Sequence, residues 1–324
     1  MKRSRTFTAL NIAVALSLAL LSCILATRAH AAQVLNIGYQ KYSTFSILKA
    51  RGTLEKALAP LGYTVAWHQF LSGPPLMEAL NAGSVDIGHT GETPPVFAQA
   101  GGVPFVYLGF ENPSPHAVAI LVPANSSIKT LADLRGKTIA AGKGTSAHYL
   151  LVRALEKGGV PYSAVHIAYL SPPDGRAALT QGSVDAWAIW DPFYAAAQGS
   201  GVRVLHDGEG LVAYREFYIG NKSFVRQHPN VVKVVLSQLR ATDAWATKHK
   251  HDVAVLLSPQ LGLSVAVLDR VVSRRTYGTN PMTPAAIAYQ QHLADTFYDL
   301  GVVPVQVDVR DAIAAAPAAA SARP

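Results

Sequence analysis

Short apolar runs alternate with helical segments along the first part of this 324-residue chain. Apolar runs of strand length occupy residues 34–39, 64–70 and 85–89, and segments with helical apolar spacing occupy 45–58 and 74–82. This βαβα order predicts an α/β fold, in which a mostly parallel sheet carries helices on both faces. Ligands of such sheets bind beyond the carboxyl ends of the strands, where the loops lie.

One stretch of the sequence occurs twice. Residues 79–86 (ALNAGSVD) recur with the same internal spacing at residues 178–185 (ALTQGSVD). Each copy reads as a helix end, a glycine turn and an incoming strand, and proline follows each strand at the expected first turn of the next helix. The repeat predicts two similar α/β lobes, and chance similarity of so short a match is the alternative.

The strands that connect the two copies set the expected lobe boundaries. Residues 118–123 read as a strand that carries the chain out of the first lobe, and the chain returns after residues 217–220. From residue 229 onward the pattern is largely helical. We therefore expect lobe I at residues 32–117 and 220–311, lobe II at 118–219 and a disordered, Ala/Pro-rich tail at 312–324.

The first 31 residues have the layout of a secretory signal peptide. A basic start precedes an apolar run, and an Ala-x-Ala cleavage site ends at Ala31. A retained membrane anchor is one alternative. Cys23 raises another, a lipoprotein cleaved before that cysteine, but the residues ahead of Cys23 fit a lipobox poorly. We therefore expect export, with a mature chain that begins at Ala32.

Removal of this leader would change both the charge and the cysteine content. It would take away four basic residues and no acidic ones, so the formal net charge would fall from +8 to +4. It would also take away the only cysteine, so neither disulfides nor thiol chemistry are expected. A modest positive charge attracts anions weakly, and no dense Lys/Arg stripe indicates nucleic-acid binding.

A glycine-containing turn at residues 142–149 joins a strand-like run to a helical one. Thr145 and Ser146 are good N-cap residues, and the first helical turn exposes N–H groups without partners in the helix. Those donors and the helix dipole favour an anion. Helix capping alone also explains the composition. A P-loop is excluded, because Lys143 is followed by Gly144.

Four segments match a known family: residues 37–41 (IGYQK), 90–100 (TGETPPVFAQA), 128–137 (IKTLADLRGK) and 184–194 (VDAWAIWDPFY). Over nearly its whole length the mature chain resembles the periplasmic aliphatic-sulfonate-binding proteins of ABC importers, which are relatives of taurine- and nitrate-binding proteins. The third segment is generic among such receptors, whereas the second and fourth favour the sulfonate branch.

The resemblance implies a type II periplasmic-binding-protein fold with two lobes and two hinge crossovers. It further implies a monomeric periplasmic receptor without cofactor or metal. Such a receptor closes around its ligand and delivers it to a membrane ABC permease with a cytoplasmic ATPase, for sulfur acquisition.

The resemblance also implies a cleft to which both lobes contribute ligand-binding residues. Those residues are Gln40, Thr90, Gly91 and Glu92 from the first lobe, and Thr145, Ser146, Ala147, His148, Trp190 and Asp191 from the second. A sulfonate has three acceptor oxygens, which we assign to the Gln40 amide, the Thr90 and Ser146 hydroxyls, and backbone N–H groups near Gly91 and at Ala147 and His148. Neutral donors suffice beside a helix N-terminus.

The remaining candidates have more than one expected role. Trp190 would form an apolar wall for the ligand tail, with Phe193 and Tyr194 as further candidates, or else would be a core aromatic. Glu92 and Asp191 would repel an anion, so we expect them to orient a donor, accept a polar group of the tail or pair across the lobes. His148 would bind the anion as an imidazolium or lie on the helix surface.

Several ligands and one other protein class remain open. Taurine, a sulfate ester or another small anion could replace the sulfonate, whereas nitrate would leave a tryptophan wall with nothing to pack on. An exported enzyme of the same fold is the other class. The sequence has no Gly-x-Ser-x-Gly elbow, no cysteine that survives export and no His-x-x-x-His metal spacing, so we expect no catalysis.

Overall fold

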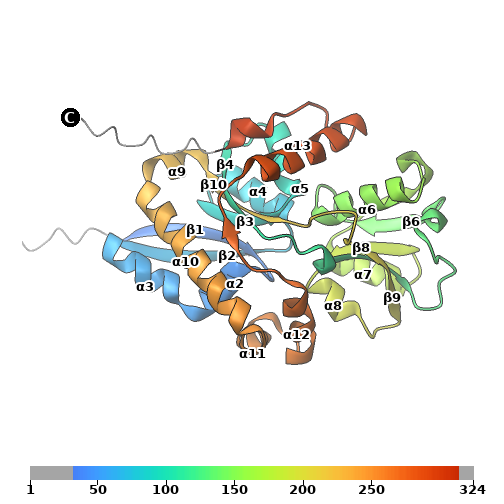
Figure 1. Ribbon diagram of the computed structural model, residues 1–324, viewed down its shortest axis with the longest axis horizontal. Coiled ribbons are helices and arrows are strands. Elements are labelled where there is room, and N and C mark those ends of the chain that lie inside the picture. The colour runs from blue at the N-terminus through green and yellow to red at the C-terminus, as the bar shows by residue number, and fades with distance from the viewer. Residues whose placement is uncertain (1–31, 314–324) are drawn as a thin grey trace, which may run out of the picture.

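The computed structural model describes residues 32–313 as two β-sheets with helices packed on their faces (Figure 1). The expected signal peptide, with Cys23, lies outside the described residues. Within them, no helix is long and apolar enough to cross a membrane.

The first sheet takes its strands from both ends of the described chain: β1 (Gln33–Gln40), β2 (Tyr63–Phe70), β3 (Ile87–Gly91), β4 (Phe105–Glu111), β10 (Glu216–Asn221) and β11 (Thr279–Asn280). The second sheet is continuous in sequence: β5 (Val118–Pro123), β6 (Thr138–Ala141), β7 (His166–Tyr169), β8 (Ala186–Trp190) and β9 (Val202–Asp207). Their orders are β11-β4-β10-β3-β1-β2 and β7-β6-β8-β5-β9. The chain therefore crosses between the sheets through residues 112–117 and 208–215.

Helices connect the strands and form most of the C-terminal segment. The α-helices are α2 (Thr44–Arg51), α3 (Thr53–Leu58), α4 (Gly73–Asn81), α5 (Thr93–Ala100), α6 (Ser146–Lys157), α7 (Pro172–Thr180), α8 (Phe193–Ala197), α9 (Lys222–Gln227), α10 (Pro229–Lys248), α11 (Lys250–Leu261), α12 (Val265–Arg274) and α13 (Pro284–Asp299). Short 3-10 helices lie at Ala59–Leu61, Pro115–Ala117, Leu131–Leu134, Tyr162–Ala164 and Val309–Ala312. In the C-terminal segment, α10 packs on α2 and α3, α12 reaches α8 beside the second sheet, and α13 packs on α5 (Figure 1).

In the second sheet, the central strands β5 and β8 are apolar along their whole length, because helices cover both faces of the sheet. Every residue of β8 (AWAIW) is buried, as are all residues of β5 except its terminal proline. A half-buried strand would instead alternate apolar and polar residues. The continuous apolar runs in the sequence therefore correspond to strands that are covered on both sides.

Both sheets are mixed, but most strands of each sheet run in one direction, as expected: β1 to β4 in the first sheet and β6 to β9 in the second. β1 pairs in parallel with β2 and β3, and β6 pairs in parallel with β7 and β8. In contrast, β10 is antiparallel to β3 and β4, and β5 is antiparallel to β8 and β9. Strands β5 and β10 arrive directly from the two crossovers, which contain no α-helix. Parallel neighbours need a longer connection, usually a helix.

The sequence repeat corresponds to the same turn in both sheets. Gly83 and Gly182 both have φ of 74°, a value that favours glycine. The two aspartates that end the copies also act alike: Asp86 Oδ2 accepts the Asn36 N–H of β1, and Asp185 Oδ2 accepts the Thr138 N–H of β6, each at 2.8 Å. The two sheets are therefore built from one repeated structural unit, as the sequence predicted.

Two expected boundaries fall inside observed elements. The boundary at residue 219/220 lies within β10, which begins at Glu216 and belongs to the first sheet. The expected tail includes Ala312, which is buried, and Ile313, which forms an isolated bridge with Tyr107. Residues 314–324 of that tail lie outside the described residues. Neither the crossover nor the end of the packed chain has a local sequence signal.

A buried ion cluster ties the C-terminal segment to the first sheet. Arg275, which follows α12, pairs with Glu216 at 2.8 Å and with Glu111, and its side chain is only 3% exposed. Tyr218 donates its hydroxyl proton to Glu111 at 2.7 Å, and His89 contacts Glu216. Burial opposes ionisation, but the Arg275 guanidinium, with His89 and Tyr218, holds the pKa of Glu111 below its ordinary value.

Replacing Arg275 with methionine should therefore lower the free energy of unfolding by about 3–5 kcal/mol, because two carboxylates would stay buried without their counter-charge. Urea unfolding followed by circular dichroism measures this change. The matched control is Arg310→Met, which removes an arginine paired with Asp308 on the surface and should leave the midpoint unchanged. An Arg275→Met variant as stable as the wild type would show that the cluster contributes nothing.

Candidate functional site

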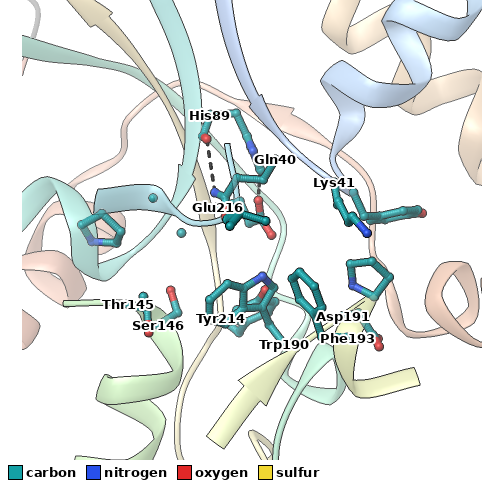
Figure 2. Close-up of a pocket in the computed structure, with 16 residues that line it drawn as sticks. Gln40, Lys41, His89, Thr145, Ser146, Trp190, Asp191, Phe193, Tyr214 and Glu216 are labelled. Atoms are coloured by element: carbon teal, nitrogen blue, oxygen red, sulfur yellow. Dashed lines mark hydrogen bonds and ion pairs between the residues drawn. The ribbon is translucent and has the colours of Figure 1, made fainter. Parts of the chain in front are cut away.

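One cavity lies where the carboxyl ends of strands from both sheets meet, and it encloses about 430 Å³ of space that is partly open to solvent (Figure 2). Both sheets and the second crossover contribute to its lining, which consists of Gln40, Lys41, Tyr42, Leu71, Gly73, His89, Gly91, Pro94, Thr145, Ser146, Trp190, Asp191, Pro192, Phe193, Tyr214 and Glu216. Among residues 32–313, no group of three or more His, Cys, Asp or Glu could hold a metal ion.

The structure brings most of the expected ligand-binding residues together in this cavity. Those that line it are Gln40, Gly91, Thr145, Ser146, Trp190 and Asp191. Four others, Thr90, Glu92, Ala147 and His148, do not line it. All four of these side chains are fully buried, so the role of each follows from the residues that it contacts.

The N-terminus of α6 offers donors to the cavity. The Ser146 hydroxyl accepts the Glu92 N–H across the cleft at 3.2 Å, which leaves the hydroxyl proton free for another acceptor. The N–H groups of Ser146 and Ala147 lie in the first helical turn, where the helix provides no acceptor. Thr145 adds no free proton, because its hydroxyl donates to Gly142 O at 2.7 Å. The Ala147 methyl group lies in the core.

The first lobe provides a second donor at the end of β1. Gln40 Nε2 donates to His89 O at 3.4 Å, and its second amide proton remains available. The neighbouring Thr90 hydroxyl instead faces Gly73, where an added Cβ would lie 2.1 Å from Thr90 Oγ1. This hydroxyl has no hydrogen-bond partner within the described part of the chain.

Aromatic rings form one wall of the cavity. Trp190 ends β8 and packs edge-to-face against Phe193, with ring centroids 6.1 Å apart. Both side chains lie between Ser146 and Lys41 in Figure 2. Trp190 is 8% exposed and so is nearly a core residue, but its remaining surface borders the cavity. Tyr194, the further candidate, does not line the cavity and stacks on the Arg274 guanidinium instead, 3.8 Å from the ring centroid.

Asp191 lines the cavity as half of an ion pair. Arg274 of α12 approaches both carboxylate oxygens at 3.1 Å, and the Ala195 N–H donates to Oδ1 at 2.9 Å. Burial raises the pKa of Asp191 to about 6 despite the opposing effect of Arg274. Because both carboxylate oxygens contact Arg274, the repulsion of a bound anion is largely cancelled.

Glu92 lies behind the cavity and connects three parts of the chain. Its Oε2 accepts the Arg215 N–H of the second crossover at 3.0 Å and the Tyr289 hydroxyl proton of α13 at 3.1 Å. Its carbonyl oxygen accepts a bond from Gln290. Burial raises the pKa of Glu92 to about 7, although the hydrogen bonds that its carboxylate accepts from Arg215 and Tyr289, and the charge of Arg215, act in the opposite direction. Of the roles considered for Glu92, the structure shows one that orients its neighbours.

His148 points away from the cavity, contrary to the expectation that its imidazolium binds the anion. Its Nδ1 accepts the Gly144 N–H at 3.3 Å, and its Nε2 lies 2.7 Å from the Tyr162 hydroxyl. Burial, with the nearby Lys143 charge, lowers the pKa of His148 to about 4. The side chain is therefore neutral and packs against Phe297. Its position in the helix turns it toward the core rather than toward the helix terminus.

Several lining residues were missed in the sequence. Lys41 directly follows Gln40 at the end of β1, so its position beyond a strand could have identified it. Tyr214 and Glu216 come from the second crossover and the start of β10, where no local pattern marks a ligand site. Tyr42 and His89 contact the cavity from positions that read as ordinary strand and loop residues.

Comparisons with known proteins identify a family and several similar chains. A model of the NMT1/THI5-like family matches residues 75–252. A protein of Escherichia coli K12 that carries the name of an aliphatic sulfonates-binding protein is 42% identical over 285 residues, which is 87% of this chain and 88% of that one. The taurine-binding periplasmic protein of the same organism is 32% identical over 53% of this chain and 54% of its own.

The fold is also similar to that of a solved structure. The alkanesulfonate-binding protein SsuA from Xanthomonas axonopodis pv. citri, bound to MOPS, is 38% identical and has a TM-score of 0.84. The match covers 89% of this chain and all of that one. The expected periplasmic-binding-protein fold is therefore confirmed, and these similar proteins are named as binding proteins.

The two lobes approach each other closely where Gly91 faces Ser146. An added Cβ would lie 2.2 Å from Ser146 Oγ but 3.4 Å from Ser146 Cβ. Gly91→Ala should therefore hold the lobes apart and increase the radius of gyration measured by X-ray scattering under conditions that close the wild type. The matched control is Gly101→Ala, where an added Cβ would make only ordinary contacts at 3.4 Å or more, and that variant should close like the wild type. A Gly91→Ala variant that closes like the wild type would contradict the close approach seen here.

Glu92 should make stability depend on pH. Its pKa of about 7 exceeds the value of about 4.3 in an unfolded chain, so its contribution is present at low pH and is lost as pH rises toward 7. Glu92→Gln keeps an acceptor for Arg215 but cannot ionise. As pH rises from 5 to 8, the free energy of unfolding of this variant should therefore rise by about 2 kcal/mol relative to that of the wild type. Denaturant unfolding at each pH tests this, with the surface variant Glu156→Gln as control. If the free energy of unfolding changed with pH in the same way for Glu92→Gln and the wild type, the prediction would be wrong.

Proposed function

Since this chain belongs to the NMT1/THI5-like family together with the aliphatic sulfonates-binding proteins, we propose that it captures aliphatic sulfonates between its two lobes. It then delivers them to an ABC permease that is driven by a cytoplasmic ATPase. The proposal includes export to the periplasm after cleavage near Ala31, and action as a monomer. It also assigns the second lobe to the chain from residue 118 to the start of β10, at Glu216.

The observation that carries this proposal is the pairing of two chemistries in one cavity. The Ser146 hydroxyl and the N–H groups of the first turn of α6 supply donors for a sulfonate head, and Trp190 supplies an apolar wall for its tail. Gln40 adds a donor from the opposite lobe. A ligand that contacts both lobes stabilises the closed arrangement, because only that arrangement makes both sets of contacts.

The charges around the cavity support an anionic rather than a cationic ligand. The Asp191 carboxylate is held by Arg274, and the Glu216 carboxylate is held by Arg275 and contacted by His89. Lys41 contributes a positive charge at the rim. A sulfonate head at α6 therefore meets helix donors, and both carboxylates that line the cavity have partners of their own.

The alternatives make different demands on the same cavity. Sulfate or another small anion would use the donors but not Trp190, and taurine would place an ammonium group against the aromatic wall. An enzyme of this fold would convert its ligand. We propose no catalytic step, and mass spectrometry of the ligand after incubation with the protein tests that point directly.

Isothermal titration with a series of linear alkanesulfonates tests head-plus-tail recognition. Each added methylene that packs on Trp190 should lower the Kd about fourfold until the cavity is full, since burial of one methylene contributes about 0.8 kcal/mol. Trp190→Ala should flatten this dependence, whereas Trp245→Ala, at a tryptophan stacked on His249 outside the cavity, should keep it. Binding of sulfate as tight as that of the alkanesulfonates, or no binding of any sulfonate, would overturn the proposal.

A further inference from the structure

The two ends of the cavity differ in the charge that they present. Ser146 and Thr145 lie at one end, beside the N-terminus of α6, and Lys41 lies at the other, with Trp190 and Phe193 between them (Figure 2). If a sulfonate head occupies the α6 end, as the proposed function requires, its tail passes over the aromatic wall toward Lys41. The far end of the tail therefore meets an ammonium group rather than an apolar surface.

The Lys41 ammonium lies over an aromatic ring and has no ion-pair partner in the part of the chain that the structure describes. Its backbone is held at the end of β1, because the Ser46 hydroxyl donates to Gln40 O at 3.1 Å and lies 3.4 Å from Lys41 O. Its Nζ lies 5.7 Å from the centroid of the Phe193 ring. Phe193 lies across the cleft, in α8, which follows β8 of the second sheet. Within residues 32–313, no carboxylate lies within 4.0 Å of Lys41 Nζ.

The neighbouring carboxylates that line the cavity have other partners. Asp191 accepts two bonds from Arg274 and one from the Ala195 N–H, and Glu216 is paired with Arg275. An ammonium donates up to three hydrogen bonds, so Lys41 can bind a further acceptor. A compact cation whose bonding capacity is unused, at the end of an aromatic wall, is suited to an anionic group on a ligand tail.

We propose that Lys41 reads a second anionic group, so that this receptor prefers sulfonates with a carboxylate at the far end of the chain over plain alkanesulfonates. The inference rests on the proposed function, because it assumes that the sulfonate head is bound at α6. Lys41 then distinguishes ligands by their tails: it favours a carboxylate, is indifferent to a methyl group and repels an ammonium group such as that of taurine.

The test is isothermal titration in a buffer free of sulfonates. The probes are sulfocarboxylates with one to four methylenes between the two anionic groups, linear alkanesulfonates of matched length, and taurine. In the wild type, the best sulfocarboxylate should bind about tenfold more tightly than its matched alkanesulfonate, the gain expected from one charge-assisted hydrogen bond at a partly exposed site.

Substitutions of Lys41 locate the source of this preference. Lys41→Met should remove the tenfold preference while the Kd for alkanesulfonates changes by no more than about twofold, and Lys41→Arg should keep a preference for the carboxylate. The charge-matched control is Lys49→Met, which removes a lysine that also lies over an aromatic ring, Tyr39, but does not line the cavity. That variant should retain the wild-type preference. Circular dichroism and the thermal midpoint verify that each variant is folded.

The possible outcomes separate this inference from the proposed function. Alkanesulfonates that bind as tightly as sulfocarboxylates, or taurine that binds most tightly, would overturn the inference and leave the sulfonate receptor intact. An equal loss of affinity for sulfocarboxylates and alkanesulfonates in Lys41→Met would also overturn it, because Lys41 would then bind the sulfonate group itself. Failure of every sulfonate to bind the wild type would overturn the proposed function, and the inference with it.

Discussion

Hydrogen bonds of a single residue, Glu92, join the ligand cavity to the parts of the chain that must move when the lobes open. Its N–H reaches Ser146 across the cleft, its carboxylate holds the second crossover through Arg215, and the same carboxylate accepts a bond from α13 through Tyr289. Tyr289 in turn accepts the Ala213 N–H of that crossover. Opening of the cleft must therefore break the bond to Ser146, while the others keep the crossover attached to the first lobe.

The site attracts an anion although carboxylates lie close to it. Asp191 and Glu216 are both buried, and each is paired with an arginine. Arg274, the last residue of α12, pairs with Asp191, and the next residue, Arg275, pairs with Glu216. Burial of an ion pair is not in itself stabilising, because desolvation costs about as much as the pairing contributes. The pairs do have a consequence for binding: they let the partial positive charge at the α6 N-terminus determine the sign of the group that binds there.

The fold was largely predictable from sequence because it is encoded in local patterns. Apolar runs identified the strands, and the repeat identified the matched turns at Gly83 and Gly182. The sequence did not identify β5 and β10 as the strands that run against their neighbours, because both arrive from crossovers that have no local signature. The end of the packed chain was also missed, since Ala312 and Ile313 look like the tail that follows them but pack against the described core.

The site was predicted in part for a related reason. A sequence position shows that a residue lies near a strand end or a helix terminus, and this identified Gln40, Ser146 and Trp190. It does not show which way a side chain turns: His148 lies in the first turn of α6 and yet packs on Phe297. It also cannot reveal partners that are distant in the chain, such as Arg274 for Asp191. Tyr214 and Glu216 enter the cavity from a crossover, so only the folded chain identifies them.

The central claim is that a sulfonate with a tail fixes the closed arrangement by contacting both lobes. The mature chain is expected to lack cysteine, so spin labels can be attached at Lys56→Cys on α3 and Lys157→Cys on α6, two exposed positions beside different sheets. Pulsed electron resonance then measures the distance between the labels with and without ligand. An alkanesulfonate should convert a broad distribution into one narrow, short distance, and sulfate should not. A distribution that no sulfonate changes, or that sulfate narrows equally, would contradict the claim.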